Sequence, residues 1–167
     1  MKLSTKGRYA VTAMADMAIH AQQAGGVEAA PLTPLSDISE RQDISLPYLE
    51  QLFARLRRAE LVESVRGPGG GYRLTRDPSE TRISDIMSAV DETLRAADCS
   101  GEVGQGCGGT REACLTHDLW AQLSAQVYLF LHEITLADVI DKRTTPCNAL
   151  PAFSALLEEE ELAASGS

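Results

Sequence analysis

Apolar and polar residues alternate with a helical period along most of this chain. Between residues 8 and 22, apolar residues recur every three or four positions from Ala10 to Ala21. That spacing places them on one face of a helix. Ser4 or Thr5 is in position to cap the helix start with a side-chain oxygen. The pattern therefore predicts an amphipathic first helix.

Two further helical stretches follow, joined by a short turn. Thr33 is expected to cap a helix whose first residue is Pro34 and which ends near Gln42. After a turn at Asp43, Ser45 begins a longer amphipathic stretch. Two helices joined in this way are typical of a helix-turn-helix motif. The side chains of the second helix that we expect to face inward are Leu46, Leu49, Leu52, Phe53 and Leu56.

A β-hairpin is predicted directly after these helices. Two short runs rich in branched and aromatic residues, at 61–65 and 72–74, flank the sequence Gly-Pro-Gly-Gly-Gly. A hairpin at this position is the wing of a winged helix-turn-helix domain. The glycine run lacks the Lys-Ser/Thr ending of a phosphate-binding loop, so we exclude a nucleotide site.

The last part of the chain is predicted to hold three more helices. A short buried helix is expected at 82–91, and a long, strongly apolar helix at 115–134. The apolar residues of the long helix extend beyond one face, which favours a partner helix from a second subunit. Thr135 and Asp138 have the spacing of a capping box for a final short helix. The predicted fold is thus mostly α, with a small β-hairpin wing and a long dimerisation helix.

The charge distribution limits the possible partners. The net charge is −9, but residues 51–76 contain six arginines against Glu60 and Glu63. An acidic chain with one basic region must bind nucleic acid through that region, if it binds at all. No apolar run is long enough to span a membrane and the start does not resemble a signal peptide, so we expect a cytoplasmic protein with no membrane partner.

Three of the four cysteines lie close together, between the predicted DNA-binding domain and the long helix. Seven residues separate Cys99 from Cys107, six separate Cys107 from Cys114, and two separate Cys114 from His117. Three thiolates and an imidazole are ligands for an iron–sulfur cluster, zinc or cuprous copper. The spacing differs from that of a zinc finger, and a reducing cytoplasm disfavours a disulfide. We therefore predict a metal or cluster site.

The predicted second helix of the helix-turn-helix motif offers side chains that suit DNA bases. Gln51 can bind adenine through two hydrogen bonds, Glu50 can accept from cytosine, and Tyr48 can contact a phosphate or a thymine methyl group. Arg66 on the wing suits a narrow minor groove. The candidates for phosphate contacts are Lys6, Arg8, Arg55 and Arg73.

Three sequence stretches carry a resemblance to a known family. They read LSTKGRYAVTAM at 3–14, SLPYLEQLFARLRRAELVESVRGPGGGYRL at 45–74, and CLTHDLW at 114–120. Through them the chain resembles the IscR family of iron–sulfur cluster regulators, which are dimeric winged-helix transcription factors. The resemblance covers about residues 1–140.

The resemblance implies a function and a set of site residues. Such proteins act as repressors or activators of the genes for iron–sulfur cluster assembly, and cluster occupancy changes which promoter DNA they bind. The resemblance implies a homodimer that receives its cluster from the assembly machinery. The implied ligands of one [2Fe–2S] cluster per subunit are Cys99, Cys107, Cys114 and His117. The implied DNA contacts come from Ser45, Tyr48, Glu50, Gln51 and Arg66.

These expectations divide the chain into four parts. Residues 1–92 form the winged helix-turn-helix domain, 93–117 the cluster-binding loop, 115–141 the dimerisation helix with its short following helix, and 142–167 a disordered acidic tail.

Two alternatives remain open from the residues. One is a nitric-oxide or redox-sensing regulator on the same fold. The other is a zinc-stabilised DNA-binding or interaction protein. An enzyme is not expected, because the sequence contains no nucleophile-plus-base motif, paired catalytic carboxylates or phosphate loop.

Overall fold

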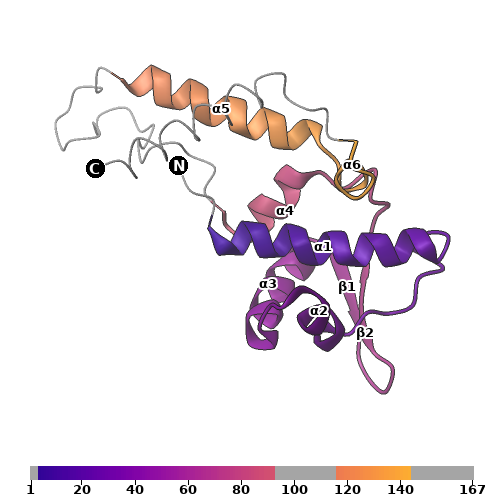
Figure 1. The fold of residues 1–167 in the computed structure, drawn as a ribbon. Helices are drawn as coiled ribbons and strands as arrows, with labels where there is room; N and C mark the ends of the chain where they lie inside the picture. Colours follow the sequence, from indigo (N-terminus) through magenta and orange to yellow (C-terminus); the bar gives the residue numbers. More distant parts are fainter. Residues whose placement is uncertain (1–3, 93–115, 144–167) are drawn as a thin grey trace, which may run out of the picture.

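The computed structural model describes residues 4–92 and 116–143, which form six α-helices and one two-stranded hairpin (Figure 1). This confirms the predicted fold class. In chain order the elements are α1 Thr5–Gln23, α2 Leu35–Gln42, α3 Leu46–Arg58, β1 Val62–Val65, β2 Gly71–Leu74, α4 Ile83–Ala89, α5 His117–Glu133 and α6 Leu136–Ile140.

Helix α1 is the central element. In Figure 1 it runs across the middle of the molecule, with α2, α3 and the hairpin on one side and α4, α5 and α6 on the other. Ala10, Ala13 and Ala18 are completely buried along it. Their small side chains let neighbouring helices approach closely, and α1 contacts α2, α3, α4, α6 and β2. The predicted cap is confirmed, since the Ser4 hydroxyl accepts a hydrogen bond from the Lys6 amide.

Helix α3 packs one apolar face into the core. Leu49, Phe53 and Leu56 are completely buried, and each such side chain contributes about 1.5–3 kcal/mol through its removal from water. The Phe53 ring also meets the Tyr72 ring of β2 edge-on, with centroids 4.9 Å apart. Leu46 was wrongly predicted to face inward. As the first residue of α3 it extends past the edge of the core, and 37% of it is exposed.

The hairpin pairs Val62 with Leu74 and Val65 with Gly71 in antiparallel register. The segment before α2 joins this sheet, because Thr33 and Tyr72 exchange two backbone hydrogen bonds of 2.8 and 2.9 Å. The predicted role of Thr33 as a helix cap is therefore wrong. Its backbone belongs to the sheet, and Pro34 occupies the cap position of α2. A Cβ at residue 71 would lie 2.7 Å from the Thr33 carbonyl carbon, so only glycine fits this pairing.

The capping box predicted at the last helix is confirmed. The Thr135 hydroxyl accepts from the Asp138 amide, and the Asp138 carboxylate accepts from the Thr135 amide. Leu136, just inside this helix, is completely buried. Backbone hydrogen bonds from Ile83 to Ile134 and from Leu136 to Thr81 tie the end of α5 and the start of α6 to α4. The last two helices are therefore fixed to α4 and, through α6, to α1.

Helix α5 is apolar on two sides. Trp120, Val127 and Leu131 are half-buried along one stripe, and α5 contacts α4. Leu119, Leu123 and Phe130 follow a second stripe, at spacings of four and seven residues, and are exposed by 57%, 40% and 59%. None of the residues from His117 to Glu133 is fully buried. The prediction that apolar residues of this helix extend beyond one face is confirmed. Leu115 and residues 144–167 of the predicted acidic tail 142–167 lie outside the described residues.

A buried carboxylate that the sequence analysis did not identify joins α1 to α2. Asp16 is only 4% exposed. Its carboxylate accepts from the Arg41 guanidinium at 2.6 and 3.1 Å and from the Gln42 amide at 2.8 Å. Burial alone raises the pKa of Asp16, but the hydrogen bonds from Arg41 and Gln42 outweigh it and hold that pKa below its ordinary value. The contact fixes the first helix of the helix-turn-helix motif against α1.

We predict that Asp16→Asn lowers the free energy of unfolding at pH 7 by about 1.5–3 kcal/mol, because it removes charged hydrogen bonds from a buried site. Since the pKa of Asp16 is lowered on folding, its contribution is present above the ordinary pKa and is lost as the pH falls through the folded value. The difference between the two proteins should therefore shrink below about pH 4. Urea denaturation across this pH range measures it. Glu40→Gln, an exposed change on α2, is the control. Equal stability of Asp16→Asn and the native chain at pH 7 would contradict the role given to Asp16.

Candidate nucleic-acid interface

The turn between α2 and α3 has the geometry of a helix-turn-helix motif. Asp43 ends α2 in the left-handed conformation, with φ of 51°. The next side chain, Ile44, is buried, and the Ser39 hydroxyl donates to the Ile44 carbonyl at 2.6 Å. The turn is thus held by α2 and by the burial of Ile44, and it fixes the direction in which α3 leaves.

The face of α3 opposite the core is polar and open. Glu50 and Gln51 are exposed there, as predicted, and Ser45 is exposed at the cap position just before the helix. Tyr48 is half-buried, because its ring lies edge-on to the Tyr9 ring of α1, with centroids 5.9 Å apart. That contact leaves fewer orientations to Tyr48 than to the other three side chains.

The hairpin holds Arg66 beyond the body of the domain. Arg66 follows the last residue of β1 and is exposed. Glu63 and Arg73 face each other across the two strands and form an ion pair. The Phe53–Tyr72 contact and the Thr33–Tyr72 backbone pairing attach the base of the hairpin to α3 and to the segment before α2. The wing and α3 therefore have a fixed relative position.

The four predicted phosphate-contacting residues have different surroundings. Arg8 is exposed on the first turns of α1. Lys6 lies nearer the start of the same helix, with its ammonium 3.5 Å from the Asp91 carbonyl oxygen. Arg55 pairs with the Asp91 carboxylate, and Arg73 pairs with Glu63. The two paired arginines must share their charge with a carboxylate, which leaves less of it for a phosphate.

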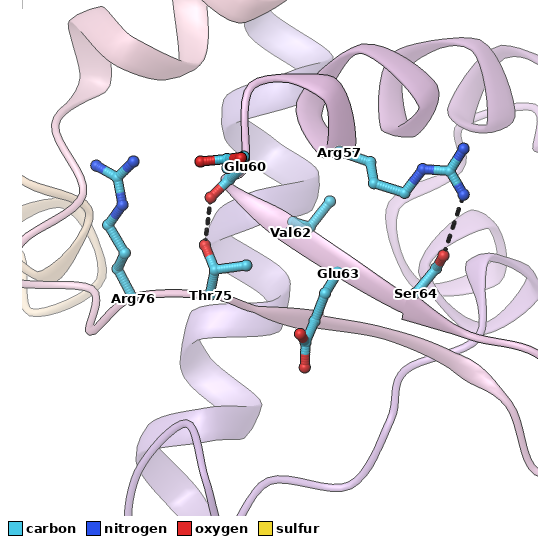
Figure 2. A pocket seen from close by; sticks show the side chains of 7 residues that line it. All are labelled: Arg57, Glu60, Val62, Glu63, Ser64, Thr75 and Arg76. Atoms are coloured by element: carbon cyan, nitrogen blue, oxygen red, sulfur yellow. Dashed lines mark hydrogen bonds between the residues drawn. The ribbon is translucent and has the colours of Figure 1, made fainter.

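A shallow depression of about 560 Å³ lies beside strand β1 (Figure 2). Figure 2 shows Arg57 and Arg76 on its two sides, with Glu60 and Glu63 between them. The Arg57 guanidinium donates to the Ser64 hydroxyl at 3.2 Å. Because the opposite charges balance, this depression is not a basic groove for a phosphate backbone.

The structure describes one of the four predicted metal ligands. His117 is the first residue of α5 and is half-exposed. Cys99, Cys107 and Cys114 lie outside the described residues. Within residues 4–92 and 116–143, no three potential metal ligands gather at one point.

Two carboxylates that sequence reasoning missed contact this surface. Asp91 pairs with Arg55, and the Glu92 carboxylate accepts hydrogen bonds from the first turn of α1. Both follow Val90, the last buried apolar residue of the α4 region. A pair of acidic residues after a short helix is common on protein surfaces, so the sequence carried no signal for these long-range contacts.

A helix-turn-helix motif followed by an antiparallel hairpin, with exposed polar side chains on its second helix, defines a winged-helix DNA-binding protein. Comparison with known proteins gives the family. Residues 3–142 match the model of the Rrf2 family, described as iron-dependent transcriptional regulators. The chain belongs to the Rrf2 family.

The chain is also similar to several named transcriptional regulators. The chain is 51% identical over 160 residues to the HTH-type transcriptional regulator IscR of Cereibacter sphaeroides, and the match covers 96% of this chain and 100% of the relative. It is 57% identical over 141 residues to IscR of Aliivibrio salmonicida, covering 84% and 77% of the two chains. The predicted resemblance to the IscR regulators is thereby confirmed.

Solved structures agree with the fold. T. potens IscR superimposes with a TM-score of 0.65 at 36% identity, over 86% of this chain and 88% of that one. CymR, the global cysteine regulator of B. subtilis, gives a TM-score of 0.66 at 30% identity, over 85% and 98%. The chain is therefore a DNA-binding transcriptional regulator and not an enzyme, and promoter DNA is its partner. No helix in the described part of the chain has the length and apolar character to cross a membrane.

Proposed function

We propose that this regulator senses an iron–sulfur cluster and controls the genes for cluster assembly, binding promoter DNA according to whether the cluster is present. One observation carries the proposal. The chain belongs to a family of iron-dependent regulators, and it has three cysteines and a histidine within nineteen residues. These residues follow the DNA-binding domain and extend to the first residue of the long apolar helix.

The donor set fits a [2Fe–2S] cluster. Cys99, Cys107, Cys114 and His117 would hold it, one cluster per subunit, and the assembly machinery would supply it. Bound there, such a cluster supplies one-electron redox chemistry, and an imidazole ligand tends to raise its potential relative to thiolate alone. An imidazole binds iron only in its neutral form, so protons compete with the metal for such a ligand. The half-exposed ring of His117 at the start of α5 leaves it accessible.

The DNA-reading role is assigned to the polar face of α3 and to the wing. Glu50 and Gln51 would reach base edges in the major groove, and Arg66 would enter the adjacent minor groove. Their exposure, and the fixed position of the wing against α3, support this arrangement. The further contacts that we propose come from Ser45 and Tyr48 on α3 and from Lys6, Arg8, Arg55 and Arg73 to phosphates.

The regulator would act as a homodimer formed through α5. The side of α5 that carries Trp120, Val127 and Leu131 faces α4. The second stripe, which consists of Leu119, Leu123 and Phe130, is therefore open to a partner helix. A helix with two apolar stripes exposes one of them to water, at a cost in free energy, unless a second subunit covers it. A dimer would also present two α3 helices to two half-sites of DNA.

For DNA recognition, we predict that Gln51→Ala and Arg66→Ala each weaken binding to the specific promoter site by about 1–3 kcal/mol. Each removes a proposed base contact and leaves the fold intact, because both residues are exposed. Fluorescence anisotropy with labelled promoter DNA measures the loss. The matched controls are Gln23→Ala, at the end of α1, and Arg143→Ala, beyond α6. Unchanged affinity in both test variants would contradict the assigned interface.

For the metal, we predict that protein purified without air absorbs visible light and contains about two irons per subunit. Cys114→Ala should abolish both, and Cys147→Ala, which changes the cysteine outside the proposed set, should keep both. A colourless protein that contains zinc in place of iron would favour the zinc-stabilised alternative. Iron and zinc analysis with absorption spectroscopy distinguishes the two.

For the dimer, we predict that Phe130→Glu converts the protein to a monomer, because the charge would have to be buried between two copies of α5. Light scattering after size-exclusion chromatography gives the mass. Ile19→Glu makes the same kind of change at an apolar residue on α1 that is 39% exposed, and it should remain dimeric. If the native chain is itself a monomer at micromolar concentration, the role of α5 is wrong.

A further inference from the structure

The end of α4 sets the direction of two acidic side chains. The Asp91 amide donates to the Ser88 carbonyl at 3.1 Å, and the Glu92 amide donates to the Met87 carbonyl at 3.0 Å. Asp91 takes the left-handed conformation between them, with φ of 53°. These bonds form a Schellman motif, which ends a helix in one fixed direction. Because Val90 next to it is completely buried, the core holds this end of the helix in place.

Glu92 caps helix α1 from a distant part of the chain. One carboxylate oxygen accepts from the Ser4 amide at 2.9 Å, and the other accepts from the Gly7 amide at 3.2 Å and from the Ser4 hydroxyl. Burial acts to raise the pKa of Glu92, but the hydrogen bonds from Ser4 and Gly7 outweigh it and lower that pKa below its ordinary value. A carboxylate at a helix N-terminus also meets the favourable end of the helix dipole.

The contact leaves little room for a side chain at residue 7. A Cβ there would lie 2.5 Å from the Met87 sulfur and 3.1 Å from Cγ of Glu92. The backbone of α1 at Gly7 therefore lies directly against the side chains of Met87 and Glu92. A shift of residue 92 would act on the first turn of α1 without an intermediate.

Asp91 connects the same point to α3. Its carboxylate pairs with Arg55 of α3, and its carbonyl oxygen lies 3.5 Å from the Lys6 ammonium. Two adjacent residues thus contact both helices that carry proposed phosphate-binding side chains, namely α1 with Lys6 and Arg8 and α3 with Arg55. The cysteine-bearing stretch starts at the next residue of the sequence, and Cys99 is seven positions after Glu92.

We propose that Glu92, together with Asp91, is the positioning residue through which the cysteine-bearing stretch controls how α1 and α3 present Lys6, Arg8 and Arg55 to DNA. The inference rests on the proposed cluster sensing and adds the residues that transmit it. Neither carboxylate needs to touch DNA or the cluster. Glu92 acts through the first turn of α1, and Asp91 acts through Arg55.

The test compares DNA binding by iron-loaded and iron-free protein. The probe is a duplex selected from a random library by the iron-loaded native chain. Its affinity for the two forms of the native chain should differ by the roughly 5- to 150-fold that is typical of allosteric coupling. In Glu92→Gln and in Asp91→Asn, the visible absorption should remain while this ratio falls toward one. Asparagine tolerates the left-handed conformation of residue 91, so the turn itself survives.

A second readout separates positioning from simple destabilisation. In Glu92→Gln the affinity should depend less steeply on salt concentration, because fewer counterions leave the DNA when Lys6 and Arg8 no longer reach its phosphates. The slope of log affinity against log salt should change by about 0.9 for each phosphate that is no longer bound. A variant that merely weakened the fold would bind less tightly in both forms and keep the native ratio. Glu80→Gln removes the same charge from an exposed residue before α4 and should match the native chain in ratio and salt dependence.

The outcomes are distinct. If the native chain shows the ratio and both test variants keep it, the relay through Glu92 and Asp91 is wrong while cluster sensing stands. Loss of visible absorption in Glu92→Gln would also overturn the inference, because Glu92 would then serve the cluster itself. If the iron-loaded and iron-free forms of the native chain bind the duplex with equal affinity, the proposed function is wrong, and the relay with it.

Discussion

The burial of one face of α3 beneath α1 is the contact on which the rest of this structure depends. Leu49, Phe53 and Leu56 are removed from water entirely, and the small residues of α1 allow the two helices to approach closely. With that face fixed, the opposite face of α3 has to point to solvent, which is where Glu50 and Gln51 lie. The wing takes its position from the same contact, because Tyr72 packs on Phe53. The position of the proposed DNA-reading surface therefore follows from how the core is filled.

The local elements were predictable from the sequence because short-range rules determine them. The Ser4 cap, the α2–α3 turn, the hairpin and the Thr135–Asp138 capping box all depend on residues a few positions apart. Leu46 was misplaced because it lies at the very start of α3, and Thr33 was misplaced because a distant segment competes for its backbone groups. Thr33 pairs with Tyr72 because the sheet offers its amide and carbonyl two partners, which the local sequence cannot reveal. The pairing of Asp16 with Arg41 and the capping of α1 by Glu92 were missed for the same reason.

The candidate site was predictable to a different degree in its two parts. The exposure of Glu50, Gln51 and Arg66 followed from the helix period and the hairpin, and the structure agrees. Ser45 occupies the predicted cap position of α3, but its side chain makes no capping hydrogen bond. The partners of Arg55 and Arg73 did not follow, because an ion pair with Asp91 or Glu63 depends on tertiary distance. The three cysteines fall outside the described residues, so their assignment rests on the chemistry of thiolate ligands and on the family.

The two halves of the proposed function are connected in the sequence by residues 93–116. Residue 92 ends the described part of the DNA-binding domain and touches the first turn of α1, and residue 117 begins the helix that bears the second apolar stripe. A group bound by residues between these positions would have short covalent connections to both the DNA-reading domain and the dimer helix.

The most direct test of this account is a titration of promoter DNA with the native protein in three successive states. These are as purified without air, after removal of iron, and after the cluster is rebuilt. The account predicts that promoter affinity changes when iron is removed and returns to its first value when the cluster is restored. Equal affinity in all three states, in a protein whose iron content demonstrably changes, would contradict it.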